Sequence, residues 1–224
     1  MRSKKYQNIK EKIVAKAYSL DEAIEFIKTN SSAKFDQTLE IHVNLGIDPK
    51  KTEQQVRGMV VLPAGATKKK RIAVFVGTGK EKEAQDAGAD IIGGKKLIEE
   101  IKNTGKCDFD IAVAEPDMMR ELSLIARILG PKGLMPNPKT DTVTTEIAKT
   151  VSQLQKGKVS FKSDAGGNIH QAVAKVSWPA EKIKENIEAF LNIVRKSKPA
   201  GVKGLFIKNV VLASTMGPGI KVQL

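Results

Sequence analysis

The stretch Leu212-Ala-Ser-Thr-Met-Gly-Pro-Gly-Ile220 separates two short apolar runs, residues 205–212 and 220–224, and it decides the fold. Two β-type runs joined through a Gly-Pro-Gly sequence predict a strand pair and a tight turn, because glycine supplies positive φ and proline restricts φ. A lone strand pair is only marginally stable in water, so further strands must complete it. We expect those strands from the part of the chain before residue 63.

The turn itself has two interpretations. Thr215 offers a hydroxyl, Met216 offers a flexible thioether, and Gly217 and Gly219 leave the backbone bare for a close approach. The stretch is therefore either an ordinary tight surface turn or a backbone surface that docks on a flat polar partner.

The clearest upstream strand covers residues 38–45. Polar residues alternate there with apolar ones, which is the period of a sheet with one polar face, and the apolar residues are Leu39, Ile41, Val43 and Leu45. Residues 56–62 predict a second strand. Before both, Ser19 and Glu22 have the spacing of a capping box, which predicts a short helix that ends near Asn30.

The middle of the chain has a different pattern. An apolar strand at residues 72–76 opens a series in which helices and strands alternate, with further strands expected at residues 90–92 and 109–114. The helix that follows carries one apolar stripe, formed by Met118, Leu122, Ile125 and Leu129. Such alternation predicts a parallel sheet covered by helices.

Hairpin-like patterns return after residue 157, followed by a long amphipathic helix and the terminal strands. The sequence therefore predicts an α+β domain formed by both chain ends, residues 1–66 and 158–224. An α/β (Rossmann-like, parallel-sheet) domain is inserted into it at residues 67–157. We expect the two crossings, near residues 63–68 and 155–158, to act as a hinge.

Composition limits the class of partner. The 224 residues carry a net charge of +13, which indicates a polyanionic partner, either nucleic acid or an acidic membrane surface. No apolar run approaches the roughly 20 residues that span a bilayer, so membrane binding is disfavoured. The single cysteine, Cys107, excludes an internal disulfide and fits a reducing cytosol. Aromatic residues, at 4%, are too few for a base-stacking surface.

No motif in the chain predicts an enzyme. Gly77 and Gly79 follow a buried strand, but Lys82 stands where a dinucleotide fingerprint requires its third glycine, and the Walker A spacing also fails. Neither His42 nor His170 has a nearby serine or cysteine to activate. We therefore expect no catalytic residue, metal or cofactor.

Glu115 and Asp117 flank a proline at the end of a predicted strand. They are either an acid and base pair in a crevice at the sheet edge, or a structural pair in which the aspartate caps a helix.

Residues 129–139 form the most restrained loop in the sequence. Three prolines and two glycines within eleven residues predict a rigid, extended connection between two helices. Lys132 and Lys139 bound this loop and would present positive charge to phosphates. The alternative is a purely structural loop.

Several long stretches resemble one protein family throughout the chain. They are Lys34-Phe-Asp-Gln-Thr38, Gln55-Val-Arg-Gly58, Ile128-Leu-Gly-Pro-Lys-Gly-Leu-Met-Pro-Asn-Pro-Lys139, Phe161-Lys-Ser-Asp164, Gly167-Asn-Ile-His170 and Ser214-Thr-Met-Gly-Pro-Gly219. In this order they are similar to the L-one family of large-subunit ribosomal proteins, the ribosomal stalk proteins of bacterial type. The resemblance implies a two-domain fold with the second domain inserted into the first.

The resemblance also implies a non-enzymatic, cytoplasmic protein, monomeric off the ribosome, that binds large-subunit ribosomal RNA and forms a mobile stalk near the tRNA exit site. It implies assistance in the release of deacylated tRNA, and some members repress translation of their own mRNA. Carried over by position, the RNA contacts are Lys34, Phe35, Thr38, Lys162, His170, Ser214, Thr215, Met216, Gly217 and Pro218, with Lys132 and Lys139 as secondary contacts.

Three points stay open at this stage. Phe35 is either an RNA contact or a core residue, because phenylalanine is commonly buried. Ala165 stands where members of the family often carry lysine or arginine, so one phosphate contact is expected to be missing. The competing functions are an enzyme that uses the inserted domain and a nonspecific binder of DNA or membrane surfaces, which would show sequence-tolerant binding with a steep salt dependence.

Overall fold

The computed structural model describes residues 4–14, 16–31, 33–68, 70–77, 79–202 and 204–223, and the side chains of Lys5, Thr52 and Lys139 lie outside this description. The chain divides into two compact units, Met1–Thr67 with Val159–Leu224, and Lys68–Lys158. We refer to them as unit 1 and unit 2. The Lys-rich N-terminal stretch contains helix α1, Lys4–Glu11.

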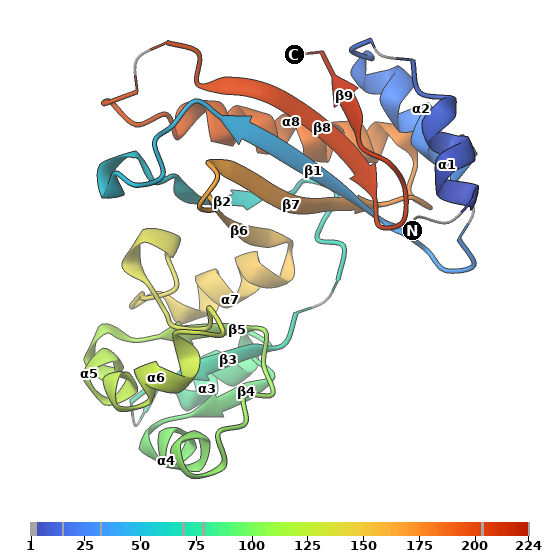
Figure 1. The fold of residues 1–224 in the computed structure, drawn as a ribbon. Helices are drawn as coiled ribbons and strands as arrows, with labels where there is room; N and C mark the ends of the chain where they lie inside the picture. The colour runs from blue at the N-terminus through green and yellow to red at the C-terminus, as the bar shows by residue number, and fades with distance from the viewer. Residues whose placement is uncertain are drawn as a thin grey trace. The chain divides into compact units, whose positions relative to one another are not determined.

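Unit 1 is built on a four-stranded sheet with the order β7-β1-β8-β9 (Figure 1). All three strand pairs are antiparallel. The prediction that an upstream strand completes the terminal pair is confirmed, because β1 pairs with β8 along its length. The strands are β1 (Thr38–Leu45), β7 (Asn168–Lys175), β8 (Ile207–Ser214) and β9 (Ile220–Val222).

The second predicted upstream strand has a different partner. Strand β2 (Arg57–Val61) pairs with β6 (Lys158–Lys162) in a separate two-stranded sheet. Ser163 joins this pair to the preceding chain, since its N–H donates to the Val56 carbonyl (2.8 Å) and its hydroxyl accepts from the Val56 N–H (3.1 Å).

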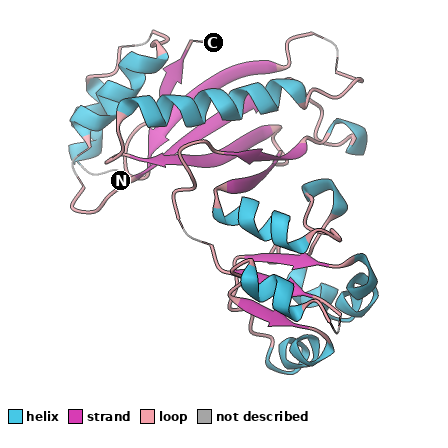
Figure 2. Cartoon of the chain, turned by 180° about the vertical axis from the view of Figure 1, so that it is seen from behind, coloured by secondary structure: helices cyan, strands magenta, loops and turns pink. Residues whose placement is uncertain are grey.

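Helices cover one face of the four-stranded sheet. Figure 2 shows α8 (Ala180–Lys196) lying across the strands, and α2 (Leu20–Asn30) contacts both β8 and β9. Ser19 caps α2 in the predicted capping box, which is therefore confirmed. The apolar residues of β1 point into this core, which also contains the buried stripe Ile183, Ile187, Phe190 and Val194 of α8.

A buried amide links three segments of unit 1. The Asn186 side chain is fully buried in α8, where its Oδ1 accepts from the Ala64 N–H (2.9 Å) and its Nδ2 donates to the Val173 carbonyl (2.7 Å). Because both ends of the amide are paired, its burial carries no unsatisfied polar group. Figure 1 shows the opposite face of the sheet, where no described helix of this unit lies in front of β7, β1 and β8.

Unit 2 contains the predicted parallel sheet. Its strand order is β4-β3-β5, with both pairs parallel, which confirms the βαβ interpretation. The elements are β3 (Ile72–Phe75), α3 (Glu81–Asp86), β4 (Ile91–Gly93), α4 (Lys95–Thr104), β5 (Ile111–Ala114), α5 (Met119–Leu122), α6 (Ala126–Leu129) and α7 (Ile147–Gln155).

The helix predicted after β5 is interrupted. Short 3₁₀ segments precede α5 and separate it from α6, at Pro116–Met118 and Ser123–Ile125. The Ser123 hydroxyl donates to the Arg120 carbonyl (2.6 Å), a local bond that competes with regular helical pairing. The predicted apolar stripe is nevertheless buried, as expected for Met118, Leu122, Ile125 and Leu129. The remaining 3₁₀ turns are Thr52–Gln54 and Pro138–Thr140.

Candidate nucleic-acid interface

The helix-free face of unit 1 is polar along the middle of the sheet. Strand β1 alternates strictly between buried and half-buried residues, so its polar residues share the outer face. Their cross-strand partners extend this surface, which we call the open sheet face. Its members are Thr38, Glu40, His42 and Asn44 on β1, Asn168 and His170 on β7, and Asn209, Val211 and Ala213 on β8.

The terminal turn is fastened to the first residue of β1. The Thr38 N–H donates to the Thr215 Oγ1 (3.1 Å), and the Thr215 N–H donates to the Thr38 carbonyl (3.1 Å). The next amide, that of Met216, donates to the Gln37 Oε1 (3.0 Å). These bonds join segments that are more than 170 residues apart and order the turn. A preordered turn binds a partner without losing further backbone entropy.

Two apolar side chains project from this region. Phe35 is 55% exposed and Met216 is 65% exposed, so Phe35 is not a core residue. They line a cavity of about 270 Å³ together with Tyr6 and Ile9 of α1. Lys34, beside them, is also exposed.

The glycines of the turn have a steric role. Neither Gly217 nor Gly219 has a positive φ, so the prediction of positive φ at this turn is wrong. A Cβ at Gly217 would collide with the Ser214 Oγ, and one at Gly219 would lie 2.8 Å from the Val211 Cγ1. Close packing of the turn on β8 therefore explains both glycines. Ser214 and Pro218, which were also predicted as contacts, are buried, so they contribute to the packing of the turn.

A second turn lies between β6 and β7. The Asp164 Oδ1 accepts from the N–H groups of Asn168 (2.7 Å) and Gly166 (2.9 Å). These hydrogen bonds lower the pKa of Asp164 to about 2, and the bond from the Asn168 N–H has the largest effect. The carboxylate is therefore ionised at neutral pH. The predicted contact Lys162 and the substituted position Ala165 are both exposed beside this turn.

A pair of imidazole rings lies at the centre of the open sheet face. His42 and His170 are directly opposed across β1 and β7, and their Nδ1 atoms are 2.8 Å apart. The His170 Nε2 lies 3.3 Å from the Asp164 Oδ2, and the His42 Nε2 lies 3.9 Å from the Glu40 Oε2. Burial lowers the pKa of His42, and the neighbouring His170 lowers it further by a smaller amount. The His42 ring is therefore neutral at neutral pH.

Sequence reasoning missed several residues of this surface. His42, Asn44, Asn168 and Asn209 were not among the predicted contacts, although the period of two had placed His42 and Asn44 on the polar face. Asn44 and Asn168 are joined across the strands, since the Asn44 Nδ2 donates to the Asn168 Oδ1 (2.7 Å). Only the strand register shows that these residues gather around His170.

The two secondary contacts belong to unit 2. The Lys132 Nζ donates to the Gly105 carbonyl (3.2 Å), and the Lys139 side chain lies outside the described residues. The loop between them is held by its own bonds, because the Asn137 carbonyl accepts from the hydroxyls of Thr140 (3.0 Å) and Thr142 (3.1 Å).

Glu115 has a structural environment. Its carboxylate accepts from the Gly77 N–H (3.0 Å) and pairs with the Lys80 Nζ (2.6 Å). The hydrogen bond from Lys80 lowers the pKa of Glu115 most, and the bond from the Gly77 N–H lowers it further. The glycine-containing loop after β3 thus donates to a carboxylate of its own unit, in a position where a nucleotide-binding loop would donate to phosphate.

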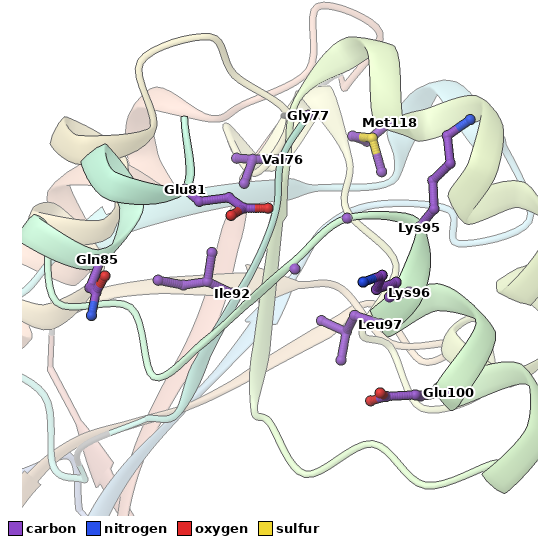
Figure 3. Close-up of a pocket in the computed structure, with 12 residues that line it drawn as sticks. Val76, Gly77, Glu81, Gln85, Ile92, Lys95, Lys96, Leu97, Glu100 and Met118 are labelled. Atoms are coloured by element: carbon purple, nitrogen blue, oxygen red, sulfur yellow. The ribbon is translucent and has the colours of Figure 1, made fainter. Parts of the chain in front are cut away.

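Unit 2 also contains a cavity of about 820 Å³ at the carboxyl ends of β3 and β4. Its lining is mixed, with apolar Val76, Ile92, Leu97 and Met118 beside Glu81, Lys96 and Glu100 (Figure 3). Figure 3 shows Lys95 extending away from Leu97 and Glu100, and its ammonium pairs with Glu121 (2.8 Å). The acidic and basic side chains of this lining leave no excess of positive charge for an anion.

Two further findings concern the described part of the chain. None of its helices has the length and apolar character needed to cross a membrane. Within the same residues, no cluster of three or more histidine, cysteine, aspartate or glutamate side chains has a geometry that could hold a metal ion.

Comparisons with known proteins agree on one family. A model described as "Ribosomal protein L1p/L10e family" matches residues 27–218. The chain is 53% identical over 208 residues to the large ribosomal subunit protein uL1 of Mycoplasma capricolum, covering 93% of this chain and 92% of the relative. It is 48% identical over 223 residues to the protein of the same name from Fervidobacterium nodosum, covering 99% and 95%. The chain therefore belongs to the ribosomal protein L1p/L10e family.

Proposed function

We propose that this protein is a structural constituent of the large ribosomal subunit and that unit 1 binds large-subunit ribosomal RNA. Family membership supports this function, since the relatives are named as proteins of that subunit. The observation that carries the choice of surface is the bonded pair Thr38 and Thr215, which orders the terminal turn beside the open sheet face.

The chemistry of this surface suits folded RNA. Double-stranded RNA offers its 2′-hydroxyls and phosphates across a shallow minor groove, and unstacked bases expose their edges in loops. The open sheet face offers amides, hydroxyls and imidazoles at fixed strand spacings. Phe35 and Met216 supply apolar contacts to a sugar or base, and the net charge of +13 supplies a salt-dependent attraction to phosphates.

The proposal assigns different roles to the two units. Unit 1, formed by both chain ends, is the RNA-binding α+β domain, and unit 2 is an inserted α/β domain that moves on a hinge at the two crossings or adds weaker contacts through Lys132 and Lys139. Limited proteolysis tests the hinge, because a hinge is expected to be cut near residues 63–68 or 155–158. The absence of cleavage at both crossings would count against it.

The same surface serves the finer functions that we propose. A stalk formed by this protein and its RNA would contact tRNA at the exit site and assist its release. An mRNA with the same fold as the ribosomal site would compete for the surface, which would allow repression of the protein's own translation. We propose a cytoplasmic, non-enzymatic protein that is monomeric off the ribosome.

The decisive experiment is RNA binding in rising salt. A large-subunit ribosomal RNA fragment that contains the stalk junction is compared with an unrelated structured RNA of equal length. We expect Thr215→Ala with Met216→Ala to lower affinity for the junction by about tenfold to about a hundredfold, because two contacts are lost, and to remove the discrimination.

Two further variants make the result specific. Thr215→Ser keeps the hydroxyl and is expected to retain discrimination when paired with the natural Met216. Leu205→Ala removes an apolar side chain that is 72% exposed and precedes β8, at the end of the strand remote from the turn, so it is expected to change little. Equal, indiscriminate binding by wild type and double variant would overturn the choice of surface.

A further inference from the structure

The imidazole pair on the open sheet face has a fixed order of hydrogen bonds. Asp164 is ionised and can only accept, so the tautomer of His170 that fits this contact carries its hydrogen on Nε2, 3.3 Å from the Asp164 Oδ2. The Nδ1 of His170 is then an acceptor. Because the two Nδ1 atoms are 2.8 Å apart, His42 carries its proton on Nδ1 and donates it to His170. The His42 Nε2 therefore bears a lone pair.

This lone pair lies beside a second acceptor. The Glu40 carboxylate is 3.9 Å from the His42 Nε2, and the two side chains are 42% and 31% exposed. Two acceptors at this separation attract a hydrogen-bond donor placed between them, and none of the described side chains donates to either atom. An RNA offers two groups of this kind, the ribose 2′-hydroxyl and the N–H groups of a base edge.

We propose that Asp164, His170 and His42 form a relay that holds the His42 Nε2 as an acceptor, through which His42 recognises a hydrogen-bond donor of the bound RNA. This inference rests on the proposed function and adds a specificity-determining residue to it. His42 touches the RNA, whereas His170 and Asp164 act here as positioning residues.

One proton reverses the relay. If the proton joins His170, this ring donates from both nitrogens, and His42 must accept at Nδ1 and carry its own proton on Nε2. If the proton joins His42, its Nε2 carries a proton as well. In both cases Nε2 becomes a donor and turns to the Glu40 carboxylate, so the recognition of an RNA donor is lost.

The charged groups around the pair define this pH effect. Glu40 on β1 raises the pKa of His42, but by less than burial and His170 lower it. Asp164 in the β6–β7 turn contacts the His170 ring (3.3 Å). Val211 of β8, which opposes His42, has no charge, and Lys221 of β9 opposes Val211 at the next strand. The pKa of His42 lies below its ordinary value of 6.5, so the acceptor state prevails at neutral pH and is lost as the pH falls.

The first measurement is made on the free protein. Nitrogen-15 shifts of the imidazole rings at about pH 8 distinguish the two neutral tautomers of a histidine. We expect the Nδ1–H form at His42 and the Nε2–H form at His170. An Nε2–H form at His42 would overturn the relay without reference to any RNA.

The second measurement uses the junction RNA with single changes along the bound segment. One set replaces single riboses by 2′-deoxyribose, and another replaces guanosine by inosine, which removes the base amino group. We expect one such change to weaken wild-type binding by about threefold to about tenfold, the effect of one hydrogen bond. The deoxyribose set identifies a 2′-hydroxyl as the donor, and the inosine set identifies a base.

Matched variants connect that change to His42. His42→Asn keeps a donor for His170 but has no acceptor at the position of Nε2, so the RNA change should have no further effect on its binding. His42→Gln places an amide oxygen near the position of Nε2 and is expected to restore part of the effect.

Asp164→Asn tests the relay at its other end. Its Oδ1 still accepts from the Asn168 and Gly166 N–H groups, while an amide N–H₂ now faces His170, which turns the whole chain of bonds around. We expect it to behave like His42→Asn with unchanged backbone shifts outside the turn.

The pH dependence separates this role from simple charge attraction. As the pH falls from about 8 through the lowered pKa of His42, the effect of the identified RNA change should decrease in wild type. If acidification instead strengthens binding and preserves the effect, His42 and His170 are phosphate contacts and the proposal is wrong. If wild type fails to distinguish junction RNA from unrelated RNA at any pH, the proposed function fails before the relay is tested.

Discussion

The two units differ in whether polar groups near their sheets have hydrogen-bond partners within the same unit. In unit 2, the carboxylate of Glu115 is paired with Lys80 and the Gly77 N–H, so both this carboxylate and that amide have partners within the unit. In unit 1, none of the described side chains donates a hydrogen bond to the Glu40 carboxylate or to the His42 Nε2, and Phe35 and Met216 project into solvent. The comparison favours unit 1 for the proposed binding surface, because polar groups on its sheet are left for a partner, whereas the carboxylate beside the sheet of unit 2 is paired within the unit.

The largest expected effect is a loss of stability caused by substitutions in the two hydrophobic cores. Phe190 in unit 1 and Phe75 in unit 2 are both fully buried, and each packs edge-on against another phenylalanine, at centroid distances of 5.5 and 6.1 Å. Truncation of either to alanine should lower the free energy of unfolding of its own unit by about 3–5 kcal/mol. We expect Phe190→Ala to weaken RNA binding near its unfolding temperature and Phe75→Ala to leave it unchanged.

The two unfolding events can be followed separately. The only tryptophan, Trp178, belongs to unit 1, so its fluorescence reports that unit, and amide hydrogen exchange in β3 and β5 reports unit 2. Equal loss of RNA binding in both variants would show that unit 2 supports the RNA-binding surface, contrary to the comparison.

A smaller effect is expected at the satisfied carboxylate of unit 2. The lowered pKa of Glu115 means that its ionised form stabilises the folded unit above the ordinary pKa of 4.5, and that this stabilisation is lost as the pH falls through the lower folded value. Glu115→Gln should therefore cost about 1–2 kcal/mol at neutral pH, and the difference from wild type should shrink on acidification.

Hydrogen exchange of unit 2 between about pH 7 and about pH 3 measures this effect. Glu146→Gln is the matched control, because Glu146 forms an exposed pair with Lys149 (3.0 Å) whose removal should change stability by less than about 0.5 kcal/mol. A pH-independent deficit in Glu115→Gln would mean that the lost charge is not the cause.

The smallest expected effect concerns the packing of the terminal turn. Gly217→Ala forces Ser214 to move and should lower the stability of unit 1 by about 1 kcal/mol. Gly201→Ala is its control, since a Cβ at Gly201 meets no atom within 4 Å. Thermal unfolding followed by Trp178 fluorescence compares them. Equal midpoints would show that the turn adjusts without strain.

Much of the local structure was predictable because it depends on neighbours in the chain. The alternation at residues 38–45 became β1, and the capping box at Ser19 became the start of α2. The apolar run at residues 72–76 became the central strand of the parallel sheet. In each case the period of the apolar residues matches the period of the element, so no distant contact is needed to choose the structure.

The predictions that failed depended on contacts between distant segments. The strand predicted at residues 56–62 was expected to lie beside the terminal strands, but β2 pairs with β6 instead. Strand character alone does not identify the neighbouring strand. Gly217 and Gly219 were assigned to positive φ, whereas their small size is explained by Ser214 and Val211 beside them. The interrupted helix of unit 2 is a local exception, since the Ser123 hydroxyl bonds to the Arg120 carbonyl at the interruption and the apolar stripe does not reveal this bond.

By itself, the sequence determined the kind of protein: its charge, its two patterns of strands and helices, and the motifs that resemble a ribosomal family. Only the tertiary structure decided which of its polar residues act together. His42 and His170 are separated by 128 positions, and their rings meet because β1 and β7 pair in a single register. A shift of that register by one residue would turn one of them to the other face of the sheet, since side chains alternate along a strand.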